Sequence, residues 1–209
     1  MTETDVLETL ARVGALVTGD HIVYTSGRHG SSYVNKDALY PHTSATGDAC
    51  AQIARHFAAA GIEVVAGPTV GGVIMAQWTA HHLGQLLGHE VLAVYAEEEQ
   101  SELGKARAFR RGYDALLAGR RVLVVEDILT TGGSARMVVQ AVEQAGGTVV
   151  GVAALCNRGG ITADLLGAPE LYSLASVPLE SWSAEECPLC ASGVPVNTRL
   201  GKGAAFVKG

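Results

Sequence analysis

The sequence predicts an α/β protein with a central, mainly parallel sheet, and two observations lead to this prediction. Short apolar runs, typical of strands that are covered on both faces, alternate along the chain with longer segments of helical periodicity. Glycine-containing turns separate the two kinds of segment. Such an alternation is typical of parallel strands joined by crossover helices, because each crossover returns the chain to the same edge of the sheet.

The sequence pattern of the amino-terminal half predicts three helices and two strands. Apolar residues at helical spacing predict a helix over about 4–16 and a second over about 44–60, which ends at Gly61. The apolar run 62–66 predicts the first strand of the sheet. The glycine loop 67–72 then breaks the chain before a third helix that runs to about Leu87, and a strand over 91–96 follows.

The carboxyl-terminal half completes the sheet. The continuous apolar run 122–125 predicts a buried strand, and Ala135, Val138 and Val142 begin a helical pattern that ends near Gly146. A β-rich run over 148–156 then completes a βαβ unit. A short helix over 162–166 and a strand over 171–176 come next, so that the expected sheet has five strands flanked by helices.

Composition indicates one soluble domain. The chain has 209 residues, of which 48% are hydrophobic and 17% charged, enough for one sizeable core. The formal net charge of −6 argues against nucleic-acid and membrane partners, which require a basic surface. No apolar run approaches the roughly 20 residues that span a bilayer, and the first residues lack a signal sequence. We therefore expect a cytoplasmic protein.

The four cysteines do not predict a disulfide framework in a chain of this size. Cys50 and Cys156 fall on a predicted helix and strand, where they are expected to pack as small apolar residues. Cys187 and Cys190 have a spacing that can bind zinc. A structural zinc site needs four ligands, however, and no second pair lies nearby in the sequence. No protein-held metal is therefore expected.

The segment 122–134 is the most informative in the chain. Burial of two carboxylates in a core would cost several kcal/mol, so we expect Glu126 and Asp127 to emerge at the carboxyl edge of their strand, where open α/β sheets bind ligands. The glycines and hydroxyls of 130–134 then precede a helix, and this combination suits an anion such as a phosphate. The alternative is a tight turn with a solvated acid pair.

A second candidate anion site is the glycine loop 67–72, which also joins a strand to the beginning of a helix. Taken alone, this loop is equally consistent with a structural turn.

The sequence Val-Leu-Val-Val-Glu-Asp-Ile-Leu-Thr-Thr-Gly-Gly-Ser resembles the phosphoribosyl-diphosphate signature of type I phosphoribosyltransferases. The resemblance implies that Glu126 and Asp127 contact the ribose hydroxyls and that the loop after them binds the 5′-phosphate. It assigns phosphoribosyl diphosphate to Glu126, Asp127, Ile128, Leu129, Thr130, Thr131, Gly132, Gly133 and Ser134. It assigns the leaving diphosphate to Thr69, Val70, Gly71 and Gly72. It also implies Mg²⁺, held mainly by substrate oxygens and water.

The segment 20–42 is similar to the amino-terminal hood of orotate phosphoribosyltransferases, with Ser26, Gly27, Arg28, Tyr33 and Asn35 at matching positions. Its alternative is a surface hairpin. The resemblance implies that Arg28, Lys36, Thr130 and Arg158 approach orotate, Arg158 at the carboxylate, although Asn157 replaces the usual acid. It also implies a homodimer. Each chain is expected to form a single domain over 1–209, with a core at about 44–160 and a hood built from 1–43 and 161–209.

The segment after the strand 91–96 departs from the family pattern. The catalytic lysine that is usual in the family is missing here, and an acidic run over 97–102 takes its place. We expect this run to be a solvated face rather than a magnesium site. We expect 97–113 to be a mobile lid whose Lys105, Arg107 and Arg111 join Glu126 and Asp127 as catalytic residues, with Arg110 as a further cation. The Cys-Pro-Leu-Cys tail resembles that of a bacterial branch with the same lid.

The resemblance implies an orotate phosphoribosyltransferase, a pentosyltransferase that converts orotate and phosphoribosyl diphosphate to orotidine 5′-monophosphate and diphosphate in UMP biosynthesis. Two alternatives remain. A purine phosphoribosyltransferase shares the signature but needs neither Arg158 nor the hood. A nucleotide-sensing regulator on the same fold would bind the substrate without turnover, and a basic helix-turn-helix, which the sequence lacks, would mark it.

Overall fold

The computed structural model describes residues 2–24, 26–101, 104–177 and 180–207, which fall into two compact units. The first, here called the sheet unit, comprises Met1–Val6 and His42–Val177. The second, here called the terminal unit, comprises Leu7–Pro41 and Pro178–Gly209. Thr25 of the predicted hood and Glu102 of the acidic run lie outside the described residues.

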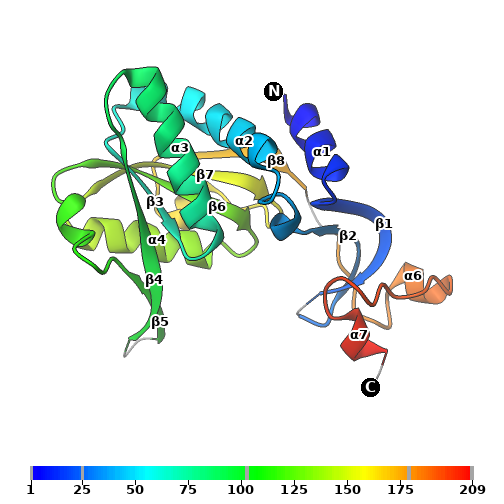
Figure 1. The fold of residues 1–209 in the computed structure, drawn as a ribbon. Coiled ribbons are helices and arrows are strands. Elements are labelled where there is room, and N and C mark those ends of the chain that lie inside the picture. The colour runs from blue at the N-terminus through cyan, green and yellow to red at the C-terminus, as the bar shows by residue number, and fades with distance from the viewer. Residues whose placement is uncertain (1, 25, 102–103, 178–179, 208–209) are drawn as a thin grey trace. The chain divides into compact units, whose positions relative to one another are not determined.

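The sheet unit confirms the predicted α/β class with a mainly parallel sheet (Figure 1). Its strand order is β5-β4-β3-β6-β7-β8, and every neighbouring pair is parallel except β4 and β5. The strands are β3 (Val64–Pro68), β4 (Leu92–Ser101), β5 (Gly104–Ala108), β6 (Arg121–Leu129), β7 (Thr148–Asn157) and β8 (Leu171–Ser176). The five expected strands are present, and β5 is a sixth.

The helices of the sheet unit cover both faces of the sheet. Figure 1 shows α2 and α3 on one face and α4 on the other. The bounds are α2 (Thr43–His56), α3 (Gly71–Leu87), α4 (Gly133–Gln144) and α5 (Ala163–Leu166), with short 3₁₀ turns at Ala58–Ala60 and Asp114–Leu116. The first helix of the chain, α1 (Glu3–Arg12), is shorter than the predicted 4–16, because Leu16 already begins a strand.

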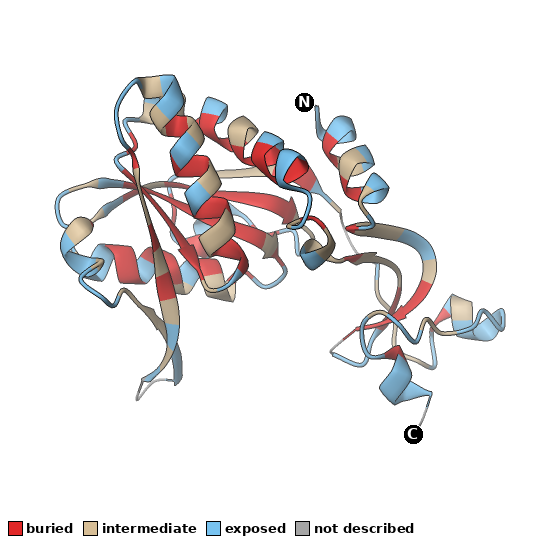
Figure 2. Cartoon of the chain, in the orientation of Figure 1, coloured by how far each residue is buried: buried red, intermediate tan, exposed pale blue. Residues whose placement is uncertain are grey.

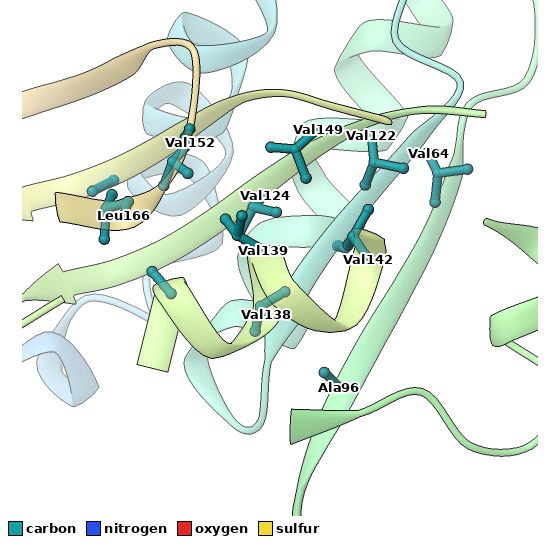
Figure 3. Close-up of a cluster of buried hydrophobic side chains, with 14 of the residues drawn as sticks. Val64, Ala96, Val122, Val124, Val138, Val139, Val142, Val149, Val152 and Leu166 are labelled. Carbon is teal, nitrogen blue, oxygen red and sulfur yellow. The ribbon is translucent and has the colours of Figure 1, made fainter. Parts of the chain in front are cut away.

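The alternating faces of β6 explain its continuous apolar run. Val122 and Val124 belong to the buried cluster that packs against Val138 and Val142 of α4 (Figure 3). Leu123, between them, is also 0% exposed and points to the opposite face, since successive side chains of a strand alternate. Figure 2 shows the central strands buried and the outward faces of the helices exposed. A strand covered on both faces can therefore carry polar residues only near its ends.

The strand expected to end at Ala96 continues to Ser101 and forms an antiparallel hairpin with β5. Part of the segment expected as a mobile loop is therefore a ladder, in which Glu98 stands opposite Arg107. Opposite charges on paired strands stabilise such a ladder, and the continuous run of polar residues concealed it from an argument based on apolar periodicity.

The core beneath the signature loop yields a stability prediction. Leu166 of α5 is 1% exposed, and its neighbour Leu165 is 58% exposed. Replacing Leu166 by alanine removes packing beneath Gly132 and should lower the free energy of unfolding by about 2–5 kcal/mol, as buried leucines do. Leu165→Ala is the matched control and should change it by less than about 0.5 kcal/mol. Urea denaturation checks both variants, and equal effects would contradict this packing.

The terminal unit joins the two ends of the chain. Its two-stranded antiparallel sheet consists of β1 (Leu16–Val23) and β2 (His29–Val34), so the hairpin alternative for 20–42 describes its backbone. The carboxyl-terminal segment, with α6 (Pro188–Ala191) and α7 (Gly203–Phe206), bonds to this hairpin through His29 and Trp182, whose N–H groups donate to each other's carbonyl oxygens at 2.8 and 2.9 Å. Within the described ranges, no helix is long and apolar enough to span a membrane.

Candidate active site

The two acids of the signature segment are held inside the end of β6. Both acids lie among the last four residues of β6, at its carboxyl end as expected, but Glu126 is 7% and Asp127 4% exposed, so the expectation that their carboxylates emerge was wrong. The strand continues to Leu129. Each carboxylate accepts a hydrogen bond from the backbone N–H of the following residue: Asp127 N–H donates to Glu126 Oε1 at 3.0 Å, and Ile128 N–H donates to Asp127 Oδ1 at 2.6 Å. Such bonds offset part of the desolvation cost and fix the carboxylates.

The loop between β6 and α4 has the form of an anion cradle. Thr130 and Thr131 are exposed, and Gly132 has the left-handed φ of 73° that glycine adopts without steric cost. A Cβ on Gly132 would also lie 2.9 Å from Leu166 Cδ2, so glycine is required by both conformation and space. α4 begins at the next residue, and its first N–H groups and dipole favour a phosphate at this position.

The second predicted anion loop joins β3 to α3. Gly67 and Gly72 approach each other so closely that a Cβ on Gly72 would lie 2.5 Å from Pro68 Cδ and 3.0 Å from the Gly67 carbonyl carbon. The Thr69–Val70 peptide bond is cis, and Thr69 N–H donates to the carbonyl of Ala96 at 3.1 Å. The absence of side chains leaves the backbone of Gly71 and Gly72 at the first turn of α3, where N–H groups suit a diphosphate.

Arg107 joins the two loops. Its guanidinium donates to Thr69 Oγ1 at 3.0 Å in the β3–α3 loop and to Ser134 Oγ at 3.2 Å in the first turn of α4, directly after the β6–α4 loop. Arg107 is half-buried on β5, and its Nε is buried without a hydrogen-bond partner among the described residues. A planar cation between two anion loops can contact phosphate oxygens on either side.

The other cations of the hairpin have acidic partners. The ion pairs are Lys105 with Glu98 at 3.0 Å, Arg110 with Glu99 at 2.6 Å and Arg111 with Glu97 at 3.0 Å. The hydrogen bond from Lys105 lowers the pKa of Glu98, and the hydrogen bond to Glu97 raises the pKa of Arg111. The acidic run thus pairs with the basic residues that follow it, and Arg107 alone among these cations is shown bonded to the loops.

Arg158 lies at the same sheet edge, since its N–H and that of Gly159 both donate to the carbonyl of Leu129, at 3.0 and 3.1 Å. Asn157 holds the segment by donating to the Ile161 carbonyl at 2.8 Å and accepting from the Ile161 N–H at 3.0 Å. An ionised aspartate in its place could accept but not donate. The asparagine that departs from the family pattern thus has a local role, and the backbone brings Arg158 beside Thr130.

The remaining predicted residues, Arg28 and Lys36, belong to the terminal unit. Arg28 Nε donates to Ser181 Oγ at 2.9 Å, and its guanidinium also bonds to the Ser181 carbonyl. Lys36 begins a short 3₁₀ helix over Lys36–Ala38. Ser181 belongs to no sequence motif, so the sequence did not predict its contact with Arg28.

Comparisons with known proteins agree with this geometry. The phosphoribosyl transferase domain family matches residues 36–165. The chain is 36% identical over 195 residues to an orotate phosphoribosyltransferase of Pelotomaculum thermopropionicum, covering 93% of this chain and 95% of that protein. It is also 32% identical over 197 residues to that of Chlorobium phaeobacteroides, covering 94% and 95%. The chain belongs to the orotate phosphoribosyltransferase family.

Solved structures of this family share the fold. The orotate phosphoribosyltransferase of Mycobacterium tuberculosis H37Rv in complex with Fe(III) dicitrate superposes with a TM-score of 0.65 at 26% identity, covering 84% of this chain and 96% of that one. The same enzyme in complex with 5-phospho-α-D-ribosyl 1-diphosphate gives a TM-score of 0.62 at 26% identity, covering 83% and 95%. The predicted orotate phosphoribosyltransferase family and the predicted α/β fold are thus confirmed.

Proposed function

We propose that this orotate phosphoribosyltransferase transfers the 5-phosphoribosyl group of phosphoribosyl diphosphate to orotate, forming orotidine 5′-monophosphate and diphosphate for UMP synthesis. The observation that supports it most is the bridge from Arg107 to Thr69 and Ser134. A substrate with phosphate at one end and diphosphate at the other requires two anion loops, and a cation held between them neutralises charge that grows as diphosphate leaves.

The chemistry assigns a role to each group in the sheet unit. As the bond from ribose C1 to diphosphate breaks, positive charge develops on the ring, and the ring nitrogen of orotate attacks from the opposite face. The cradle 130–134 holds the 5′-phosphate, the loop 69–72 holds the diphosphate, and the buried Glu126 and Asp127 accept hydrogen bonds from the ribose hydroxyls. Catalysis of this kind is mainly positional and electrostatic.

The hard oxygen atoms of the site suit Mg²⁺, because carboxylates and phosphate oxygens are the ligands that this ion prefers. Glu126 and Asp127 are the carboxylates next to the cradle, and the substrate's own oxygens would fill most of the coordination positions of the ion. When bound, Mg²⁺ would neutralise part of the diphosphate charge. We further propose a homodimer, as the family resemblance implies, and a cytoplasmic location.

Orotate carries a carboxylate that purines lack, and Arg158 is the residue whose geometry suits it. A guanidinium can bind a carboxylate through two parallel hydrogen bonds, each worth about 1.5–3 kcal/mol when charged. Arg158→Ala should therefore raise the KM for orotate about 10²–10⁴-fold while the KM for phosphoribosyl diphosphate changes little. Steady-state kinetics with each substrate varied checks this, with Arg136→Ala, on the neighbouring helix α4, as control. Equal effects on both KM values would remove Arg158 from the orotate site.

The acceptor is identified by following orotate absorbance with phosphoribosyl diphosphate and Mg²⁺, and then offering adenine, hypoxanthine and uracil in separate reactions. We expect orotate to be consumed and the other bases to be left unchanged. Consumption of a purine alone would favour a purine phosphoribosyltransferase. Tight binding of phosphoribosyl diphosphate without turnover of any base would favour a nucleotide-sensing regulator.

A further inference from the structure

Four potential metal ligands converge in the terminal unit, outside the proposed active site. They are His21 near the end of β1, His29 at the beginning of β2, Cys187 directly before α6 and Cys190 within α6. One ligand atom from each lies within 4.8 Å of all the others. His21 and His29 are 1% and 0% exposed, Cys187 is 1% exposed, and Cys190 is the most exposed of the four.

Three N···S distances in this cluster match the edges of a small tetrahedron. His21 Nε2 lies 3.6 Å from each of the two Sγ atoms, and His29 Nδ1 lies 3.4 Å from Cys190 Sγ. Zinc bonds of about 2.0–2.1 Å to nitrogen and about 2.3 Å to sulfur give a tetrahedral N···S edge of about 3.6 Å. The two ring nitrogens are 2.9 Å apart, somewhat less than the corresponding N···N edge of about 3.3 Å. A small separation of the imidazole rings would bring this edge to the tetrahedral value.

We propose that His21, His29, Cys187 and Cys190 form a structural Zn²⁺ site. Two sulfur and two nitrogen ligands in a tetrahedron are typical of zinc, and a set of four protein ligands leaves no open position for catalysis. Without an ion, His21 Nε2 and His29 Nδ1, 2.9 Å apart, could only share a hydrogen bond.

A neighbouring backbone group orients the first ligand. His21 Nδ1 lies 2.7 Å from the carbonyl oxygen of Val194, an arrangement that places the ring proton on Nδ1 and leaves the Nε2 lone pair for the metal. Val194 follows α6, and its N–H donates to the carbonyl of Leu189, between the two cysteines, at 2.9 Å. The segment that carries the thiols thus also fixes the histidine.

The second histidine is fixed by its backbone and by packing. His29 pairs with Trp182 through both backbone hydrogen bonds, and its ring meets that of Phe206 edge to face at 4.7 Å. Residues from three separate parts of the chain therefore position the ligands before any ion binds.

A zinc ion here would join the amino-terminal hairpin to the carboxyl-terminal segment. The two histidines and the two cysteines are separated by more than half the chain length in the sequence. Small units with limited apolar cores often depend on such a metal, and closure of a long loop reduces the entropy of the unfolded chain. Zinc therefore holds the terminal unit together and takes no part in phosphoribosyl transfer.

The test measures zinc in the full-length protein, purified under reducing conditions and dialysed against metal-free buffer, by inductively coupled plasma mass spectrometry. We expect one Zn²⁺ per chain. Cys187→Ala with Cys190→Ala should reduce it to background, whereas Cys50→Ala with Cys156→Ala, the matched pair, should retain it. His21→Gln should lose zinc, and His89→Gln, at an exposed histidine, should keep it. Zinc retained in the Cys187→Ala/Cys190→Ala protein would overturn the site.

Wild-type protein provides a second readout if the ligand variants fail to fold. Burial raises the pKa of Cys50 to about 12 and that of Cys156 to about 11, so both thiols should react slowly with iodoacetamide at neutral pH. Cys187 and Cys190 should be protected until a strong chelator removes zinc, and Co²⁺ added afterwards should give the visible absorption of a tetrahedral thiolate site. A Cys187–Cys190 disulfide, or absence of both Zn²⁺ and Co²⁺ from folded wild-type protein, would refute the proposal.

Discussion

Replacing Glu126 by glutamine and Asp127 by asparagine together should lower kcat/KM for phosphoribosyl diphosphate by about 10²–10⁴, because each charged hydrogen bond to ribose is worth about 1.5–3 kcal/mol. The amide side chains keep the size and shape of the acids, so the buried end of β6 remains filled. The change removes the negative charge that stabilises a ribose ring as positive charge develops on it. Initial rates with Mg²⁺ and saturating orotate measure the effect.

Two controls separate this loss from unfolding. Glu143→Gln removes an exposed carboxylate on α4, the helix that follows the cradle, and should leave kcat/KM unchanged. Thermal unfolding of the double variant should remain a single cooperative transition. Rates of the double variant within about threefold of wild type would mean that the acids do not contact the reacting sugar.

Arg107→Ala should lower kcat by about 10²–10³, the effect typical of removing one group that stabilises developing charge. The reason is its position: it is the hairpin cation bonded to Thr69 of one anion loop and to Ser134 in the first turn of the helix that follows the other. Arg107→Lys should recover only part of the rate, because an ammonium cannot reproduce the two-sided contacts of a guanidinium. Single-turnover kinetics separate this effect from product release.

Lys105→Ala is the matched control on the same strand. Lys105 pairs with Glu98 on the exposed face of the hairpin, and exposed pairs contribute about 0–1 kcal/mol. We expect its kcat to stay within about threefold of wild type, and Arg111→Ala to behave similarly. A larger loss in Lys105→Ala than in Arg107→Ala would reverse the assignment among the three cations that the sequence left together.

The sequence predicted the parallel sheet well, because its central strands and flanking helices follow apolar periodicity alone. It failed where polar interactions decide the structure. The hairpin of β4 and β5 depends on pairing between Glu97–Glu99 and the cations after them, and no hydrophobic pattern reports such pairing. Burial of Glu126 and Asp127 depends likewise on backbone N–H groups whose orientation exists only after β6 has formed.

The metal-ligand cluster illustrates a different limit. Cys187 and Cys190 were visible as a pair, but their partners His21 and His29 stand near the other end of the chain and lack the close spacing of a second pair. The β1–β2 hairpin brings the two histidines together, and backbone bonds to Trp182 bring the hairpin to the cysteines. Only tertiary structure shows four ligands where the sequence suggests two.

The most direct test of the proposed reaction is ³¹P NMR of the full-length protein with phosphoribosyl diphosphate, orotate and Mg²⁺. The account predicts that diphosphate and orotidine 5′-monophosphate appear in equal amounts, and that neither forms when orotate is omitted. Diphosphate released at the same rate without orotate, or no diphosphate released with it, would contradict the assignment of this site to phosphoribosyl transfer onto orotate.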